Sequence, residues 1–164
     1  MTKIILIGMG GDGVKLLGLT LGNYLVALGY NLALTFSYDS AVRGGDIMAF
    51  LDFGNEKIEN PIIDEADLMV QFSNSDKKFN CKNLITDEKV TGYATECNEI
   101  VKKPVKQFAL DNLQSNKVTN MLMFGFLIKE LGLDFKEEEI VKVLPPKFTE
   151  LNLKAIKLGY EELQ

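Results

Sequence analysis

The chain has 164 residues, of which 46% are hydrophobic and 25% charged, and its formal net charge is -5. This length fits a single domain over residues 1–164, with a core that holds roughly 70% of the surface exposed by the unfolded chain. The negative charge argues against nucleic acid and anionic membranes as partners. Apolar runs are too short for a membrane span or a signal peptide, so we expect a cytoplasmic protein.

The first half of the chain has the pattern of strands around one helix. Residues 3–8 form a short apolar run typical of a strand that is buried on both faces. Apolar residues at three- and four-residue steps predict a helix over residues 14–28, which Gly29 would close. Gly18 and Gly22 would let this helix pack closely against a sheet. Further strands are expected at residues 31–37, 47–53 and 67–73, with a shorter one at 83–88.

The second half is expected to be mainly helical. Residues 76–83 are polar and charged, which indicates a surface connection, and helical character begins beyond Pro104. A buried helix is predicted over residues 117–131, followed by shorter helices over 136–144 and 149–163. The order of elements starts as β-α-β and predicts an α/β fold: a three-layer, Rossmann-like domain with a mostly parallel sheet and a helical C-terminal part.

The string GMGGDG at residues 8–13 matches GxGxxG between a predicted strand and a predicted helix. Backbone amides at such a helix start can bind an anion, which makes a dinucleotide site the first hypothesis. That hypothesis also needs an acidic residue about 20 residues further on, and residues 33–37 contain none. An ATP-type phosphate loop is excluded because Val14 and Lys15 replace its lysine and hydroxyl residue. The glycines could equally serve only a tight turn and close packing.

Two further absences bear on catalysis. The chain contains no histidine, which removes the commonest general base and the commonest metal ligand. Its two cysteines, Cys81 and Cys97, form no CxxC pair and are expected to be free thiols in a reducing compartment. Independent catalysis by this chain is therefore disfavoured.

A second group of polar residues follows the strand predicted at 31–37. The loop SYDSAVRGG contains Arg43, which could bind a carboxylate, a phosphate or an acidic group of a partner, or could be an ordinary surface arginine. Because the carboxyl ends of parallel strands share one edge of a sheet, this loop and the glycine turn should face the same crevice. The candidate ligand-facing or subunit-facing edge comprises Gly10, Gly11, Gly13, Ser37, Tyr38, Arg43, Gly44 and Gly45.

These pieces together resemble the γ subunit of the 2-oxoacid:ferredoxin oxidoreductases, the family of the pyruvate, 2-oxoglutarate and indolepyruvate enzymes. The GGQGV of that family is similar to residues 10–14, and its SYGPEARGG loop to residues 37–45. Its I-x-x-P and A-D stretch resembles residues 58–67, and its C-terminal pattern resembles Asn120-Met121 together with Asn152, Ala155 and Gly159-Tyr160. Two departures are Asp12 in place of the glutamine and residues 39–42 in place of GPEA, and both bear on any ligand contact there.

The resemblance implies a subunit of an enzyme that decarboxylates a 2-oxoacid, forms an acyl-coenzyme A and passes electrons to ferredoxin. Thiamine diphosphate, Mg²⁺, iron-sulfur clusters and coenzyme A are expected in the complete complex, and none of them on this chain alone. The partners implied are α and β subunits, with a δ subunit and a homodimer of the isolated chain left open, and the isolated chain is expected to be inactive. The alternative is a stand-alone Rossmann-like oxidoreductase that binds a nucleotide.

Overall fold

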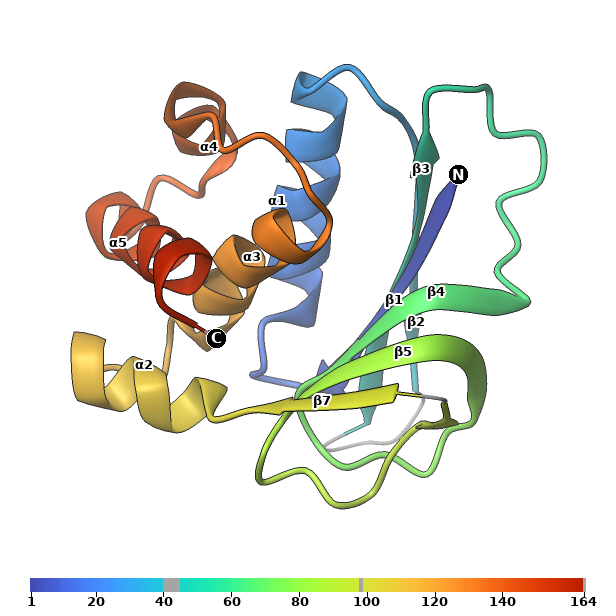
Figure 1. The fold of residues 1–164 in the computed structure, drawn as a ribbon, viewed down its shortest axis with the longest axis horizontal. Coiled ribbons are helices and arrows are strands. Elements are labelled where there is room, and N and C mark those ends of the chain that lie inside the picture. Colours follow the sequence, from blue (N-terminus) through green and yellow to red (C-terminus); the bar gives the residue numbers. More distant parts are fainter. Residues whose placement is uncertain (40–44, 98, 164) are drawn as a thin grey trace. The chain divides into compact units, whose positions relative to one another are not determined.

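The computed structural model describes residues 1–39, 45–97 and 99–163 and shows two compact units, Met1–Lys102 and Lys103–Gln164 (Figure 1). Each unit is built from its own set of elements. Strands make up most of the first unit and helices most of the second. The prediction of a single domain stays a prediction, because compactness alone does not decide whether the two units fold together.

In the described residues of the first unit the strands form one mixed sheet in the order β2-β3-β1-β4-β5-β6, with β7 paired to β5. The pairs β1–β4, β4–β5 and β5–β6 are parallel, and the pairs β1–β3 and β2–β3 are antiparallel. The bounds are β1 Thr2–Met9, β2 Asn31–Tyr38, β3 Asp46–Gly54, β4 Glu65–Gln71, β5 Phe79–Asp87, β6 Thr95–Glu96 and β7 Glu99–Lys103.

The predicted α/β fold class, with a mostly parallel sheet and a helical C-terminal part, is confirmed. The simple β-α-β start is corrected, because β1 and β2 run in the same direction but β3 lies between them, antiparallel to both. Chain length explains why β3 runs antiparallel to β2, whereas its position next to β1 depends on long-range pairing. A parallel neighbour needs a crossover of about a dozen residues or more, and the connection over residues 39–45 is long enough only for a hairpin.

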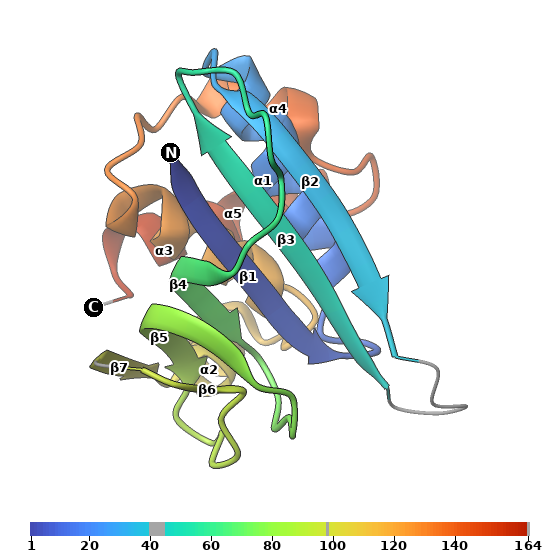
Figure 2. The same ribbon diagram turned by 90° about the vertical axis from the view of Figure 1, so that its right-hand side faces the viewer.

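Helix α1 (Val14–Ala27) packs on the face of the sheet formed by β1, β2 and β3 (Figure 2). A Cβ added at Gly18 would lie 3.0 Å from the Cβ of Ala49, and one added at Gly22 would lie 2.9 Å from Cδ2 of Leu32. Both contacts are tighter than ordinary packing, which confirms that these glycines let the helix approach the sheet. Gly29 ends the helix with a φ of 94°, the left-handed conformation that glycine adopts without steric cost.

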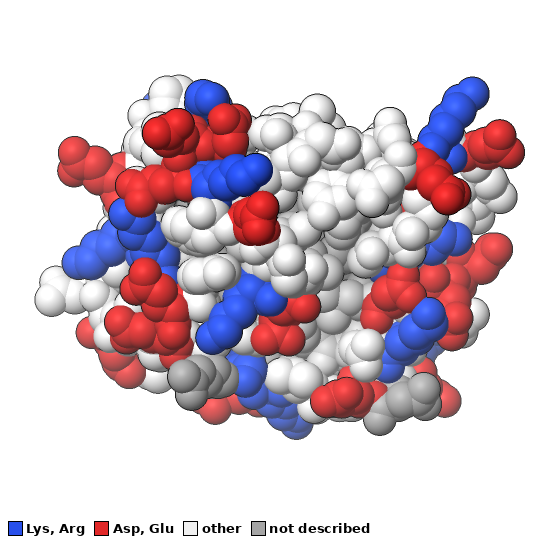
Figure 3. All heavy atoms as spheres, turned by 45° about the horizontal axis from the view of Figure 1, so that its top comes forward, with Lys and Arg blue, Asp and Glu red and all other residues white. Residues whose placement is uncertain are grey.

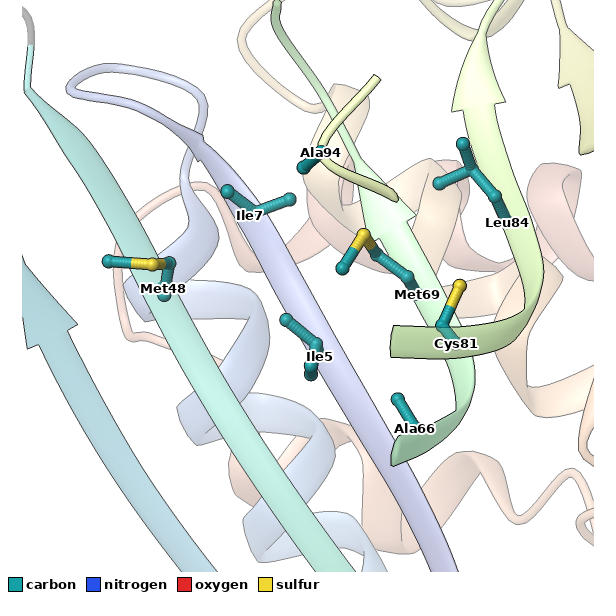
Figure 4. Close-up of a cluster of buried hydrophobic side chains, with 8 residues drawn as sticks. All are labelled: Ile5, Ile7, Met48, Ala66, Met69, Cys81, Leu84 and Ala94. Carbon is teal, nitrogen blue, oxygen red and sulfur yellow. The ribbon is translucent and has the colours of Figure 1, made fainter. Parts of the chain in front are cut away.

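The opposite face of the sheet carries its own buried apolar cluster (Figure 4). Met48 belongs to it, because successive side chains of a strand point to opposite faces and Ala49 faces α1. The cluster contains Ile5, Ile7, Met48, Ala66, Met69, Cys81, Leu84 and Ala94. Four strands and the segment before β6 contribute to it, so both faces of the sheet are packed.

Strand β5 begins earlier than predicted, which corrects the expectation of a surface connection at residues 76–83. Phe79 is half-buried, Asn80 is exposed, Cys81 is buried and Lys82 is exposed. This alternation is the period of a strand with one buried face, and it is hidden in the sequence by polar residues on the other face. The neighbouring strands β6 and β7 have no counterpart in the sequence analysis.

Asp67 joins the beginnings of three strands. Its Oδ2 accepts a hydrogen bond from the backbone N–H of Lys3 in β1 (2.9 Å), and its Oδ1 lies 2.6 Å from Nζ of Lys82 in β5. Burial raises the pKa of Asp67, but the hydrogen bonds from Lys82 and Lys3 outweigh it and hold the pKa below its usual 3.8. The carboxyl is therefore ionised near neutral pH, and this stabilising contribution is lost as the pH falls through its lowered pKa.

The second unit consists of helices that are close to those expected. The bounds are α2 Val105–Leu113, α3 Thr119–Glu130, α4 Glu137–Val143 and α5 Thr149–Glu161. Helix α3 is buried from Thr119 to Ile128, as predicted for an element that is apolar on several faces. Among the described residues no helix is both long and apolar enough to cross a membrane.

Helices α3 and α5 cross with their backbones in close contact. A Cβ added at Gly125 would lie 1.9 Å from the backbone oxygen of Ile156, and one added at Gly159 would lie 1.9 Å from the backbone oxygen of Leu122. No side-chain movement can relieve either clash, because the opposing atom belongs to the backbone. Glycine is therefore required at one position on each helix.

Lysine side chains are intermixed with Asp and Glu side chains on the face shown in Figure 3, and no large area of that face is coloured for one sign of charge alone. The phosphate backbones of nucleic acids bind extended basic surfaces. The described residues on that face form no such basic surface.

We predict that Gly159→Ala destabilises the protein by about 1–3 kcal/mol or more, because an overpacked contact forces the two helices apart. The measurement is the midpoint of urea unfolding. Gly10→Ala is the matched control, since a Cβ there meets nothing within 4 Å, and its effect should stay within about 0.5 kcal/mol. An unchanged midpoint for Gly159→Ala would contradict the close helix crossing.

Candidate functional site

Six of the eight residues singled out in the sequence are described, and they lie at the edge of the sheet where β1 and β2 end, marked by the arrowheads of these strands in Figure 2. Gly10, Gly11 and Gly13 form the turn between β1 and α1, and Ser37 and Tyr38 end β2. Gly45 directly precedes β3, whose first residues pair with the ends of both strands: Asp46 with Met9 and Ile47 with Tyr38. Arg43 and Gly44, also singled out, lie outside the described residues.

The glycine turn needs glycine at two of its positions. Gly11 has a φ of 102° and Gly13 a φ of 78°, conformations that other residues rarely adopt. Gly13 is the N-cap of α1, and its carbonyl accepts the first helical hydrogen bond from the N–H of Leu17. No side chain caps α1, so the turn is shaped by its backbone.

The carboxylate of Asp12 is used inside this turn. Its Oδ2 accepts hydrogen bonds from the backbone N–H of Met9 (2.8 Å) and from the hydroxyl of Ser73 (2.5 Å). A Cβ added at Gly8 would lie 2.8 Å from the same oxygen, so glycine there makes room for the carboxylate. An anion that approached the start of α1 would meet this negative charge. The arrangement therefore disfavours the dinucleotide hypothesis.

Residues 73–77, which follow β4, hold the edge together through three side-chain contacts. Ser73 donates to Asp12, and Ser75 donates to Oδ2 of Asp46 at 2.5 Å. Nζ of Lys77 lies 3.3 Å from a carboxylate oxygen of Asp39. We call these residues the 73–77 segment. It links the turn after β1, the end of β2 and the start of β3.

Two polar side chains, one buried and one exposed, tie the 73–77 segment to residues 91–94. Gln71, fully buried at the end of β4, donates to the carbonyls of Ser73 (2.8 Å) and Gly92 (2.7 Å) and accepts from the N–H of Ala94 (2.9 Å). Asn74 accepts from the N–H groups of Thr91 and Gly92. These bonds satisfy the polar groups of a non-repetitive segment and hold it in one place.

A cleft of about 430 Å³ opens at this edge. It is lined by Met9, Asp39, Gly45, Asp46, Asn74, Ser75 and Asp76. Three of these residues are acidic and none is Lys or Arg. The potential inside the described part of the cleft is therefore negative, which favours cationic groups over phosphates.

The described residues contain no group of three or more His, Cys, Asp or Glu residues arranged to hold a metal ion. The chain has no histidine, and Ser73 and Ser75 each donate their hydroxyl to a carboxylate. Hydrogen bonds between its own side chains fix the shape of this edge, and the aspartates that line the cleft give it negative charge.

Sequence reasoning missed the 73–77 segment. A signal was present in the string SNSDK, residues 73–77, which begins at the last residue of the buried strand predicted over 67–73. Polar residues at the carboxyl end of a parallel strand commonly lie at the crevice of an α/β sheet. Nothing in the sequence pairs Ser73 with Asp12, because 61 positions separate them.

A model of the pyruvate ferredoxin/flavodoxin oxidoreductase family matches residues 3–162, and the chain belongs to this family. It is 24% identical to the indolepyruvate oxidoreductase subunit IorB of Archaeoglobus fulgidus, over 98% of this chain and 94% of that protein. The resemblance stated from the sequence is thereby confirmed.

Solved structures show the same fold. Pyruvate oxidoreductase subunit PORC of Thermotoga maritima superposes with a TM-score of 0.75 at 21% identity, over 99% of this chain and 97% of that one. The 2-oxoglutarate:ferredoxin oxidoreductase of Magnetococcus marinus, solved with 2-oxoglutarate, coenzyme A and succinyl-CoA, matches with a TM-score of 0.75 at 18% identity. That match covers 96% of this chain and 30% of the other.

We predict that Asp12 and Ser73 are energetically coupled. Asp12→Ala should cost about 1.5–3 kcal/mol of stability and Ser73→Ala about 1 kcal/mol, because both lose a hydrogen bond to a charged group. The double variant should cost less than the sum, since the same bond is lost in each. Urea unfolding of the four proteins measures the difference.

The control cycle combines Asp12→Ala with Ser75→Ala, because Ser75 bonds to Asp46 instead. Its costs should add within about 0.5 kcal/mol. Additive costs for Asp12 and Ser73 as well would show that the bond contributes nothing.

Proposed function

We propose that the chain is a non-catalytic γ-type subunit of a multisubunit 2-oxoacid:ferredoxin oxidoreductase. The observation that carries the proposal is the extent of the matches. The chain spans nearly the whole of IorB and PORC, both of which are named as subunits. It also matches 30% of a longer chain in the 2-oxoglutarate:ferredoxin oxidoreductase of Magnetococcus marinus. A unit that occurs both as a separate subunit and as part of a longer chain is suited to assembly with others.

The reaction of the complex would be the oxidative decarboxylation of a 2-oxoacid to an acyl-coenzyme A, with electrons passed to ferredoxin. This chain has two cysteines without cluster spacing and no histidine, so its residues do not supply a cluster site. Thiamine diphosphate, Mg²⁺ and the iron-sulfur clusters would then be held by α and β subunits. The chain would contribute to catalysis through the complex, in the cytoplasm.

The acidic cleft supports a contact with a basic surface of another subunit. Three aspartates line it, and Lys77 is already paired with one of them, Asp39. An anionic ligand such as coenzyme A would need a cation, and the described residues of the lining include no Lys or Arg. Arg43, the only arginine of the chain, belongs to the loop between Asp39 and Gly45, both of which line the cleft. We assign to Arg43 the contact with coenzyme A or with an acidic group of a partner at the substrate entrance.

We predict that Arg43→Ala in the reconstituted complex raises the KM for coenzyme A or weakens subunit assembly. The reason is that the substitution removes a guanidinium group, which can donate two parallel hydrogen bonds to a phosphate or a carboxylate. Steady-state kinetics and analytical size exclusion measure the two effects. Lys57→Ala is the matched control, since Lys57 is an exposed cation that follows β3 at the opposite edge of the sheet. Unchanged assembly and unchanged coenzyme A kinetics for Arg43→Ala would remove Arg43 from this role.

A further inference from the structure

The two cysteines, Cys81 and Cys97, lie next to each other where β5 pairs with β6. Strands β5 and β6 pair in parallel, with Asn80 opposite Glu96. The next residue after Asn80 is Cys81 and the next after Glu96 is Cys97, so the pairing places the two cysteines side by side. Neighbouring strands lie about 4.8 Å apart, which is within the range of about 4.4–6.8 Å between the Cα atoms of a disulfide.

Both thiols also lie on the same side of the sheet. Cys81 belongs to the buried apolar cluster, where Figure 4 shows its side chain, and Cys97 packs against that cluster. In parallel strands, residues in register point to the same face. Burial raises the pKa of Cys81, and contact with the thiol of Cys97 raises it further. The two sulfur atoms are thus close enough to interact.

We propose that Cys81 and Cys97 are a redox modification site, which forms a reversible intramolecular disulfide on exposure to peroxide. Both are free thiols in this structure. The bond would join β5 to the chain just before β7 and close a loop over residues 82–96. This inference rests on the geometry of the two cysteines and goes beyond the proposed function.

The difference in burial assigns the order of the two steps. Cys97 is half-buried, whereas Cys81 is only 6% exposed, so peroxide reaches Cys97 first. The Cys97 thiolate attacks one oxygen of hydrogen peroxide; an S–O bond forms, the O–O bond breaks, and hydroxide leaves. The product is a sulfenic acid at Cys97.

Cys81 then resolves this intermediate. Its sulfur attacks the sulfur of Cys97; the S–S bond forms, the S–O bond breaks, and the departing hydroxide takes the thiol proton of Cys81. Two thiols lose two electrons, and one peroxide becomes two waters. A thiol reductant such as dithiothreitol reverses the change by exchange at the disulfide.

The test treats the purified, reduced full chain with one equivalent of hydrogen peroxide and follows free thiols and intact mass. We expect both thiols to disappear, the monomer to lose the mass of two hydrogen atoms, and a digest to contain one linked peptide pair with Cys81 and Cys97. Dithiothreitol should restore both thiols. A disulfide between two chains, or thiol loss without the linked pair, would overturn the proposal.

Two serine variants test the order of the steps, because serine is nearly the same size as cysteine. In Cys81→Ser the sulfenic acid at Cys97 should persist and react with dimedone. In Cys97→Ser the buried thiol of Cys81 should resist the same dose of peroxide. Equal rates of thiol loss in the two variants would contradict the assignment of Cys97 as the attacking residue.

Discussion

The hydrogen-bonded carboxylate of Asp12 determines what the amino-terminal turn can do. It accepts from the N–H of Met9 and from the hydroxyl of Ser73, and Gly8 leaves it the space. The turn therefore joins β1 to the 73–77 segment. The same charge opposes an anion at the start of α1, where a dinucleotide would place its phosphates. The turn has the glycine spacing of a nucleotide site, but its described contacts connect β1 to the 73–77 segment.

The 73–77 segment and the acidic cleft beside it are the features of this edge that bear on function. The 73–77 segment connects the ends of β1 and β2 with the start of β3 through Ser73, Ser75 and Lys77, and the cleft beside it is acidic. The described residues of this edge thus form a hydrogen-bonded, acidic surface. This agrees with the family of the chain, whose relatives include subunits of 2-oxoacid oxidoreductases.

The sequence predicted those parts of the fold that depend on local patterns. The helix over residues 14–28 and its stop at Gly29 follow from apolar period and from glycine conformation, and both are confirmed. The position of β3 between β1 and β2 depends on long-range pairing, which no local pattern contains. Strand β5 was predicted too short because its exposed residues mask its period, and the partnership of Ser73 with Asp12 forms only in the folded chain. The ligand role of the Arg43 loop stays a prediction.

Copurification from native extract tests the central claim most directly. A tagged copy of the chain is isolated at physiological salt, and the eluate is assayed for coenzyme A-dependent oxidation of pyruvate, 2-oxoglutarate and indolepyruvate. The account predicts that larger chains with thiamine diphosphate and iron-sulfur clusters accompany it, that the eluate oxidises at least one of the three 2-oxoacids, and that the isolated chain oxidises none. A chain that elutes alone and catalyses a nicotinamide-dependent reaction by itself would contradict the account.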